Sequence, residues 1–365
     1  MALDISNLPQ EAISALKQFP EFEIASFNDS GANGYVLIGR HSVLQKEVAI
    51  KIYFHGESDI DQEPTIIAKI NHENVLKVYD ARKVGKDCSY FMTPAASEGD
   101  LANFLDTYFI SLPLAHKLLC QLLSGIAALH MSPNLLVHRD LKPENLLVHN
   151  DNLLIADFGS VRRIDEKTGS APASKHSILY RPPEAFGEDS FFNFSSDIYQ
   201  AGLIGFLLFG GSLSNDLLSY LTKKQKSELT GIQGGYELSI YVDSCIEKKV
   251  SRGNLADFST LPFYIPAAIK RTLRAAISSA DKRYSSVSEF LAELSRLRGN
   301  MPDWSTRREG VLLRNWNGLD YRIPHDEVAI LKCKSGAEKY RYDKSYNCGS
   351  YAELFDQMKE RLGLP

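Results

Sequence analysis

Two short polar motifs on either side of a hairpin constrain the fold of this chain more than any other feature. Residues 137–145 read VHRDLKPEN, and residues 156–159 read ADFG. Between them lie two short apolar runs, 146–148 and 153–155, joined by the polar turn HNDN. Runs of this kind, bounded by turn residues, predict two β-strands. We therefore expect a tight hairpin that has a loop with charged residues at each end.

A lysine within an apolar strand is the second informative feature. Residues 48–51 read VAIK, and burying a lysine is costly unless its ammonium group meets anions. Upstream, residues 29–36 match the glycine-rich pattern G-x-G-x-x-G-x-V, except that Asp29 stands at the first glycine. Gly31 and Gly34 would let the backbone approach phosphate oxygens closely, although a glycine-rich turn alone is a weak signal.

The remaining pattern divides the chain by type of secondary structure. The first ninety-odd residues alternate like strands around one helical segment, 62–70. Apolar stripes at helical spacing dominate beyond Gly99, and short alternating strands return beyond Met301. The expected strands lie within 22–53, with a bend at 30–34, and at 75–84, 89–93, 311–314, 321–323, 328–332 and 339–342. The expected helices are 101–107, 114–131, 197–209, 216–229, 239–250 and 351–362.

With the two motifs in register behind the VAIK strand, the chain resembles the eukaryotic-type (Hanks) protein kinases from about residue 22 to 297. The resemblance implies an α+β protein with the two-lobed protein kinase fold, which has a small β-rich N-lobe and a larger α-helical C-lobe. We expect an N-terminal extension at 1–21, the N-lobe at 22–96, the C-lobe at 97–300 with a helical insertion near 211–260, and a separate small α+β module at 301–365.

The resemblance also assigns the groups that would transfer a phosphoryl group from ATP. Asp140 would be the catalytic base, and Lys142 would neutralise charge on the γ-phosphate. Asn145 and Asp157 would bind Mg²⁺ through the hard oxygen donors that this metal prefers. The KPE sequence at 142–144 resembles serine/threonine kinases rather than tyrosine kinases.

The implied ATP-binding residues lie in the N-lobe. Lys51 would hold the α- and β-phosphates and pair with Glu63. Pro64 is tolerated only in the first helical turn, so we hypothesise that the Lys51–Glu63 pair forms only on activation. The full set is Gly31, Gly34, Val36, Ala49, Lys51, Glu63, Pro94 and Ala96.

The hinge between the lobes departs from the common pattern. We take Thr93 as the gatekeeper, with Met92 as the alternative. Pro94 has no N–H, but adenine recognition here needs only its carbonyl group and the N–H of Ala96. The sequence is therefore compatible with ATP binding.

Residues 177–184, SILYRPPE, resemble the end of a kinase activation segment, with Pro182 where alanine is common. Ser177 would bridge the catalytic aspartate and lysine. Glu184 would pair with Arg283, and Asp197 would hold the backbone of the catalytic loop. Arg139 could receive a phosphorylated segment, helped by Arg162 or Arg163. The candidate phosphorylation sites are Ser160, Thr168, Ser170, Ser174 and Ser177.

Composition limits the partners and the compartment. The net charge of −4 and the mixed signs along the chain provide no basic stripe, so we expect no nucleic-acid partner. Five scattered cysteines without a C-x-x-C pair suggest a reducing, cytoplasmic compartment. The N-terminus does not resemble a signal peptide, and the longest apolar run is too short for a bilayer, so we expect no membrane association.

Three functions remain to be compared. An active kinase would act on a protein substrate and could have a docking partner on the 211–260 insertion or on the C-terminal module. A pseudokinase scaffold predicts the loss of Lys51, Asp140, Asn145 or Asp157, and all four are present. A kinase of small molecules generally lacks the 177–184 segment. The aromatic residues of the module would serve as a small domain core or, alternatively, as a peptide-binding surface; they are Trp304, Trp316, Tyr321, Tyr340 and Tyr342.

Overall fold

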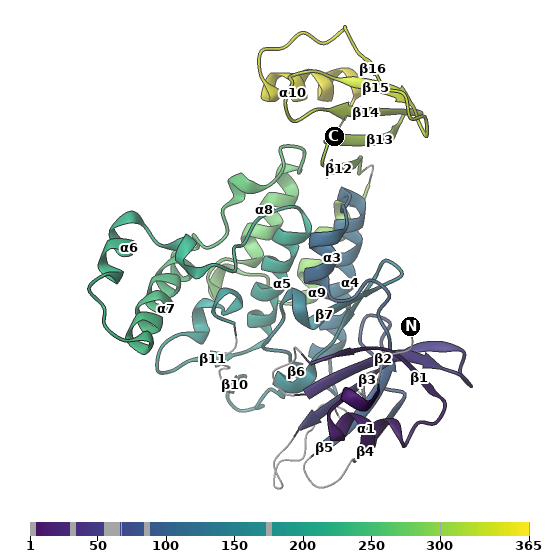
Figure 1. Ribbon diagram of the computed structural model, residues 1–365. Coiled ribbons are helices and arrows are strands. Elements are labelled where there is room, and N and C mark those ends of the chain that lie inside the picture. The colour runs from purple at the N-terminus through teal and green to yellow at the C-terminus, as the bar shows by residue number, and fades with distance from the viewer. Residues whose placement is uncertain are drawn as a thin grey trace.

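The computed structural model describes residues 5–29, 34–54, 66, 68–83, 88–172, 177–299 and 301–364. A β-rich lobe lies at one end, a helical lobe in the middle and a second β-rich unit at the far end (Figure 1). The arrangement is the α+β, two-lobed fold that the sequence predicts, with the C-terminal module added to the helical lobe.

The N-lobe is an antiparallel sheet with strand order β1-β2-β3-β5-β4. Its strands are β1 (Phe22–Asn28), β2 (Gly34–His41), β3 (Lys46–Phe54), β4 (Asp80–Lys83) and β5 (Cys88–Pro94). Alternate residues of β3, namely Val48, Ile50 and Ile52, are fully buried on one face. Helix α1 (Gln10–Leu16) was not predicted, and it covers that face with Ala12 and Ala15.

The segment between β3 and β4 differs from the expectation. Of the expected helix at 62–70, Ile66 is helical and residues 68–70 are not, while 62–65 and 67 lie outside the described residues. The expected strand at 75–84 was also too long, because β4 begins only at Asp80. Val75 instead forms a parallel bridge with Ile155, and the Leu76 N–H donates to the Ile155 carbonyl at 2.9 Å. This contact ties the N-lobe side of the chain to the hairpin of the C-lobe.

The C-lobe surrounds α5, a helix buried on nearly all sides. Its helices are α3 (Leu101–Thr107), α4 (Leu112–His130), α5 (Phe194–Leu208), α8 (Ala267–Ala276) and α9 (Val287–Arg296). The predicted hairpin forms as β7 (Leu146–His149) and β8 (Asn152–Ile155), which contact α3 and α4 respectively. Among the described residues only α4 is long and apolar enough to span a membrane, and more than half of it is buried within the protein, as expected for a core helix.

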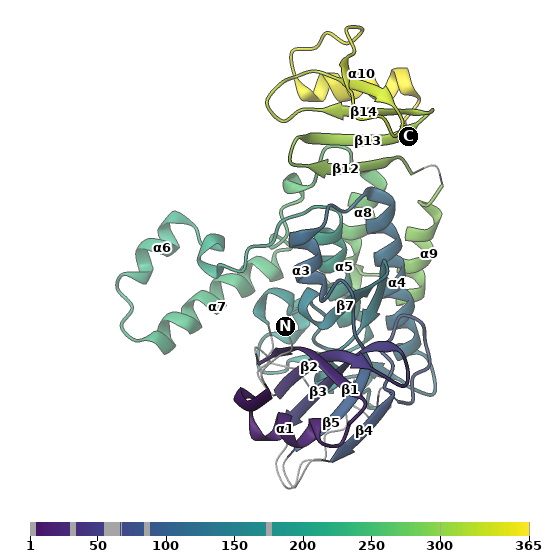
Figure 2. The same ribbon diagram turned by 45° about the vertical axis from the view of Figure 1, so that its right-hand side comes forward.

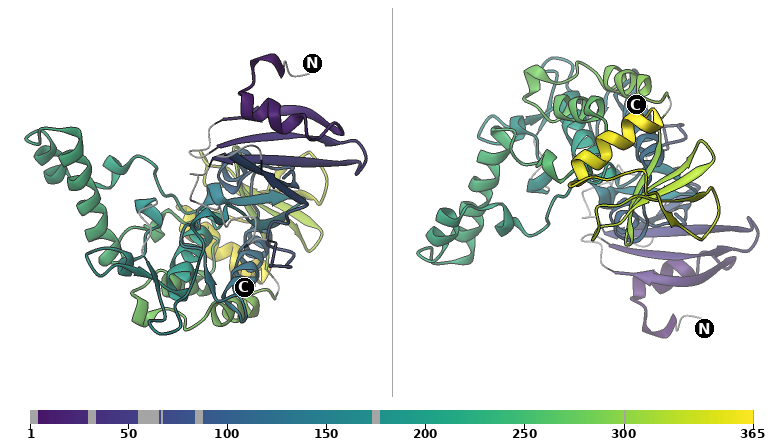
Figure 3. Two further views of the ribbon diagram at one scale, coloured as in Figure 1. Left: turned by 90° about the horizontal axis from the view of Figure 1, so that it is seen from below. Right: turned by 90° about the horizontal axis from the view of Figure 1, so that it is seen from above.

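The insertion forms an arm that projects sideways from the C-lobe (Figures 2 and 3). The expected helix at 216–229 is a 3₁₀ turn, Leu217–Tyr220, followed by α6 (Lys223–Leu229). The second helix, α7 (Gly235–Ser251), begins four residues earlier than predicted.

The C-terminal module is a five-stranded antiparallel meander with one helix. It comprises β12 (Asp303–Arg307), β13 (Gly310–Trp316), β14 (Leu319–Ile323), β15 (Leu331–Lys334), β16 (Arg341–Tyr342) and α10 (Tyr351–Leu362). The bounds of α10 match the prediction. The first strand was missed because its sequence, DWSTR, is largely polar, and the last two expected strands are shorter than predicted.

The C-terminal module packs against the helical lobe through aromatic side chains. Trp304 stacks on Tyr264 of the C-lobe with ring centroids 5.5 Å apart, and Phe263 packs on Phe355 at 4.8 Å. The Tyr264 hydroxyl also hydrogen-bonds to Thr306 at 3.0 Å. Trp304 and Tyr321 are 2% and 4% exposed, so these two aromatic side chains serve in the core rather than on a peptide-binding surface.

Candidate active site

One face of the N-lobe sheet carries the predicted nucleotide-binding side chains. Directly opposed residues on antiparallel strands project to the same face, and Val36 opposes Lys51 while Ala49 opposes Thr93. Because strand residues alternate between faces, all four point away from the face that α1 covers. Met92 opposes Ile50 and is buried on the α1 side. The register therefore supports Thr93, not Met92, as the gatekeeper.

Gly34 has a structural reason to be glycine. A Cβ atom at this position would lie 1.9 Å from the Ile52 carbonyl oxygen, so no larger residue fits beside β3. Gly31 lies outside the described residues, and the phosphate-binding role of both glycines stays a prediction.

Lys51 bridges the two lobes. Its Nζ lies 3.5 Å from Oδ1 of Asp157 and 5.6 Å from the centre of the Phe91 ring. Glu63 and Pro64 lie outside the described residues, so the predicted Lys51–Glu63 pair stays a prediction. The Asp157 carboxylate nevertheless provides an anion beside the ammonium group, which lowers the cost of placing a lysine in an apolar strand.

Asp140 sits in a compact cluster on the catalytic loop. Lys142 Nζ lies 3.1 Å from its Oδ2, and Asn145 Nδ2 donates to the same oxygen at 2.9 Å and to the Asp140 carbonyl at 2.7 Å. Asp140 and Asn145 are 6% and 5% exposed. Because the side-chain nitrogen of Asn145 is used in this way, its side-chain oxygen Oδ1 faces no donor of this cluster and can serve a cation.

Asp197 of α5 holds the backbone of this loop. Its carboxylate accepts the N–H of His138 at 2.8 Å and the N–H of Arg139 at 3.0 Å, and the His130 ring at 2.9 Å completes its contacts. Asp197 is fully buried. The structure thus places Asp197 where its predicted role requires it.

Asp157, the second residue of the second polar motif, has the left-handed backbone conformation, with φ +54°. The preceding Ala156 N–H donates to the backbone carbonyl of Asn145 at 3.0 Å, which ties the two motifs together. Burial raises the pKa of the Asp157 carboxyl, but Lys51, His138 and the Gly159 N–H outweigh it and keep the pKa below its ordinary range. Phe158 is fully buried, with its ring 5.5 Å from that of His138.

The two protein donors fit a Mg²⁺ ion whose other ligands are phosphate oxygens and water. Among the described residues, no group of three His, Cys, Asp or Glu side chains could hold a metal ion. Mg²⁺ is commonly held by one or two carboxylates together with substrate phosphates and water. The ionised Asp157 carboxylate and the side-chain oxygen of Asn145 provide donors of this kind from adjoining loops.

A model of the protein kinase domain matches residues 29–250 of the sequence. The chain belongs to the protein kinase family. Curated relatives include calcium-dependent protein kinase 6 of Plasmodium berghei, 30% identical over 42% of this chain and 10% of its own length. The serine/threonine-protein kinases SIK2 of Gallus gallus and GIN4 of Saccharomyces cerevisiae are 28% and 34% identical over 65% and 46% of this chain. The matched region spans 30% and 15% of those two relatives.

The hinge of the kinase follows β5. The Ala95 N–H donates to the Glu47 carbonyl at 3.2 Å, and the Thr93 hydroxyl donates to the Pro94 carbonyl at 3.2 Å. Within the described part of the chain, the Ala96 N–H donates to no backbone carbonyl. The predicted adenine donor is therefore available.

The activation segment of the kinase is held by short β-pairs. β9 (Arg162–Arg163) pairs with β6 (Leu136–Val137), and β10 (Ala171–Pro172) pairs with β11 (Phe191–Phe192). Arg139 Nε donates to the Ser160 carbonyl at 2.6 Å, and its Nη1 donates to the Pro172 carbonyl. Burial, followed by the charge of Arg162, lowers the pKa of Arg139 to about 10.

The candidate phosphorylation sites differ in their surroundings. Ser160 is 9% exposed, so modification there requires local opening. Thr168 is exposed, and Ser170 donates a hydrogen bond to it at 3.1 Å. Ser174 lies outside the described residues. The expected Ser177 bridge is not formed, because no hydrogen bond joins its hydroxyl to Asp140 or Lys142, which contact each other instead.

The predicted pair of Glu184 and Arg283 forms a bidentate contact at the end of the activation segment. Arg283 Nη1 and Nη2 lie 2.7 Å from Oε1 and Oε2 of Glu184, and the Ser196 hydroxyl donates to Oε1 at 2.8 Å. Burial raises the pKa of the Glu184 carboxyl, but the bonds and charge of Arg283 outweigh it and lower the pKa below its ordinary range.

Sequence reasoning missed Gln200, which bonds to both the catalytic loop and the activation segment. A glutamine inside an otherwise apolar helix, three residues after Asp197, was the available signal.

Proposed function

We propose that this kinase transfers the γ-phosphate of ATP to a serine or threonine hydroxyl of a protein, with Mg²⁺ as cofactor. The observation that carries the proposal is the cluster of Asp140, Lys142 and Asn145, which the Ala156 N–H ties to the segment that carries Asp157. Asp157 in turn lies beside Lys51. Phosphoryl transfer depends on positioning and on neutralising charge, and this cluster provides groups for both.

Each group has a definable task. Asp140 accepts the hydrogen bond of the incoming hydroxyl, while Lys142 and Asn145 fix the direction of its carboxylate. Lys142 and Lys51 place positive charge beside the transferred and the remaining phosphates. Bound Mg²⁺ would neutralise the phosphate oxygens, with Asn145 and Asp157 as its protein ligands.

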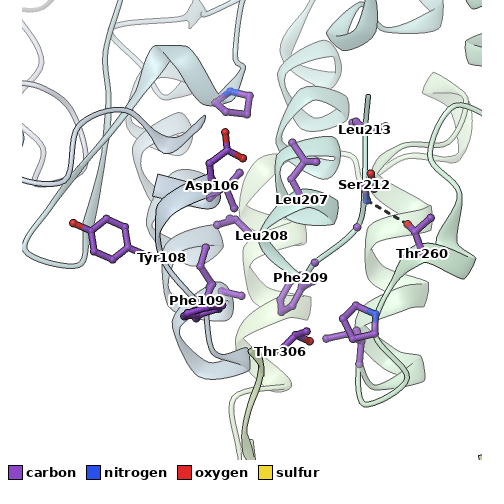
Figure 4. A pocket seen from close by; sticks show the side chains of 18 of the residues that line it. Asp106, Tyr108, Phe109, Leu207, Leu208, Phe209, Ser212, Leu213, Thr260 and Thr306 are labelled. Atoms are coloured by element: carbon purple, nitrogen blue, oxygen red, sulfur yellow. Dashed lines mark hydrogen bonds between the residues drawn. The ribbon is translucent and has the colours of Figure 1, made fainter. Parts of the chain in front are cut away.

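A pocket beside the catalytic loop favours a polypeptide as the acceptor. It has a volume of about 590 Å³, begins at Pro143 and Glu144, and reaches Thr306 of the C-terminal module. Side chains near the end of α3 and at the end of α5 line it from different elements (Figure 4). Its charged lining residues, Asp106 and Glu144, are both acidic. We propose that it holds a substrate segment carrying basic and apolar side chains.

Acceptor class can be tested with radiolabelled ATP and purified protein. The proposal predicts label on serine or threonine of a generic protein acceptor and no label with Asp140→Asn. Label found only in small molecules would support a small-molecule kinase. No incorporation by a folded, Mg²⁺-supplied protein would favour a scaffold.

We also propose autophosphorylation of the activation segment. Thr168 and Ser170 are the sites that its folded form favours, because Ser160 is buried. Phosphosite mass spectrometry should find phosphate on residues 160–177 of the wild type and none in Asp140→Asn. An unmodified segment in an active preparation would contradict this part of the proposal.

A further inference from the structure

Gln200 makes three hydrogen bonds in a buried position. The side chain is 2% exposed and lies on α5, one helical turn after Asp197. Its Oε1 accepts the Leu141 N–H at 3.0 Å. Its Nε2 donates to the carbonyl of Arg139 at 3.1 Å and to that of Tyr180 at 3.1 Å.

Two of these bonds enclose the catalytic aspartate. The Arg139 carbonyl belongs to the peptide group before Asp140, and the Leu141 N–H belongs to the peptide group after it. One side chain thus fixes both peptide planes next to the Asp140 Cα. Arg139 has φ +70°, which is unfavourable for a residue with a side chain and persists only where neighbouring contacts hold it.

The third bond reaches a different functional segment. Tyr180 lies in the 3₁₀ turn Ile178–Tyr180, within the end of the activation segment. Asp197 holds the opposite side of the loop through the N–H groups of His138 and Arg139. Gln200 differs from Asp197 because it joins the loop to the segment.

The chemistry of the site calls for an amide. Leu141 offers a donor, whereas Arg139 and Tyr180 offer acceptors, so the side chain must accept one bond and donate two. An ionised glutamate can only accept, and it would face two carbonyl oxygens. Displacement of the Tyr180 carbonyl would leave one N–H of the buried Gln200 amide without that acceptor, which is energetically costly.

We propose that Gln200 is a positioning residue that makes the geometry of Asp140 depend on the seating of the activation segment. The catalytic part of this inference rests on the proposed phosphoryl transfer. The amide is a direct link between the place where substrate docks and the group that orients its hydroxyl. A displaced segment weakens the restraint on Asp140, and a seated segment strengthens it.

Two substitutions test the link against a matched control. Gln200→Leu removes all three bonds, and Gln200→Glu keeps the size while losing both donors. Leu203→Ala, one turn further along α5 and fully buried, lowers stability but removes no hydrogen bond to the loop, because a leucine side chain makes none. Rates are expressed per folded molecule, after the folded fraction has been measured by urea unfolding.

We expect kcat for a protein acceptor to fall at least tenfold in both Gln200 variants, with the dissociation constant of ATP unchanged within twofold. Leu203→Ala should keep the wild-type kcat per folded molecule. Hydrogen exchange should accelerate at Leu141 and across residues 178–181 in the Gln200 variants only.

The two readouts separate this inference from the proposed function. If the wild type transfers no phosphate, the proposed function fails, while the exchange measurement still tests the link. Wild-type exchange in both segments of Gln200→Leu would overturn the link. A kcat within twofold of the wild type, in an enzyme shown to be active, would overturn its catalytic role.

Discussion

Lys51 of the N-lobe and Asp157 of the C-lobe meet at 3.5 Å between Nζ and Oδ1. The two residues are 106 positions apart in the chain. The Asp157 carboxylate is the anion beside the Lys51 ammonium group, and the ammonium group offsets the charge of the carboxylate. The lysine lies in β3, and the aspartate follows β8, in which Leu153 and Ile155 are buried. Their contact defines where the phosphates of a nucleotide would lie between the lobes.

Replacing Lys51 tests that location. Lys51→Met should lower kcat/KM about a hundredfold, because it removes a positive charge positioned for the phosphates. Lys51→Arg keeps the charge but not the compact ammonium geometry, and should retain more activity than Lys51→Met. Steady-state kinetics with varied ATP measure both effects. Equal activity of wild type and Lys51→Met would contradict the assignment.

The buried pair of Glu184 and Arg283 should contribute strongly to stability. Glu184→Gln leaves the Arg283 charge buried without its partner, which should lower the free energy of unfolding by about 3–5 kcal/mol. The exposed pair of Glu293 and Arg296 provides a control, and Glu293→Gln should cost less than about 1 kcal/mol. Urea unfolding at pH 7 measures both values. Equal effects of the two substitutions would contradict the prediction.

The same pair predicts a dependence on pH. The pKa of Glu184 is lower in the folded than in the unfolded protein, so its stabilisation is fully present above the ordinary value near 4.5 and is lost as pH falls through the folded pKa. The stability difference between wild type and Glu184→Gln should therefore shrink below about pH 4.5. A difference that stays constant down to pH 3 would show that ionisation of Glu184 is not involved.

Asp106 tests the substrate-side pocket. It is an exposed residue near the end of α3, so Asp106→Lys should leave the fold intact. The reversed charge should raise KM for acceptor peptides with basic residues at least fivefold, and it should leave KM for ATP unchanged. Asp356→Lys on α10, also exposed and away from the pocket, is the matched control. Identical peptide KM values for both variants would remove Asp106 from the substrate site.

The polar cluster of the active site could be predicted because the residue types themselves, carboxylates and an amide, indicate metal binding and proton acceptance. Asp140, Asn145 and Asp157 lie on two motifs joined by a short hairpin, so their proximity follows from local structure. The role of Gln200 depends on two backbone carbonyls that residue identity does not encode. Ser177 has the residue type that the expected contact requires, but it forms no hydrogen bond to Asp140 or Lys142.

Tertiary packing explains the errors in the fold. The fully buried side chains of α1 are the small ones of Ala12 and Ala15, while Leu16 is only partly buried, so the apolar face of the helix is weak in the sequence. β12 is polar apart from Trp304, and its place depends on pairing with β13 and on contact with Tyr264. The attachment of the module to the C-lobe could not be predicted, because it depends on four aromatic rings, two from each unit.

Phosphate transfer by Asp140→Asn, measured together with ATP binding, tests whether Asp140 is the group that receives the substrate hydroxyl. The substitution keeps the size of the side chain but removes the carboxylate that would accept the substrate hydroxyl. We predict that kcat falls at least a hundredfold while the dissociation constant of ATP changes less than twofold. A variant that transfers phosphate at the wild-type rate would contradict the assignment of Asp140 and, with it, the proposed mechanism.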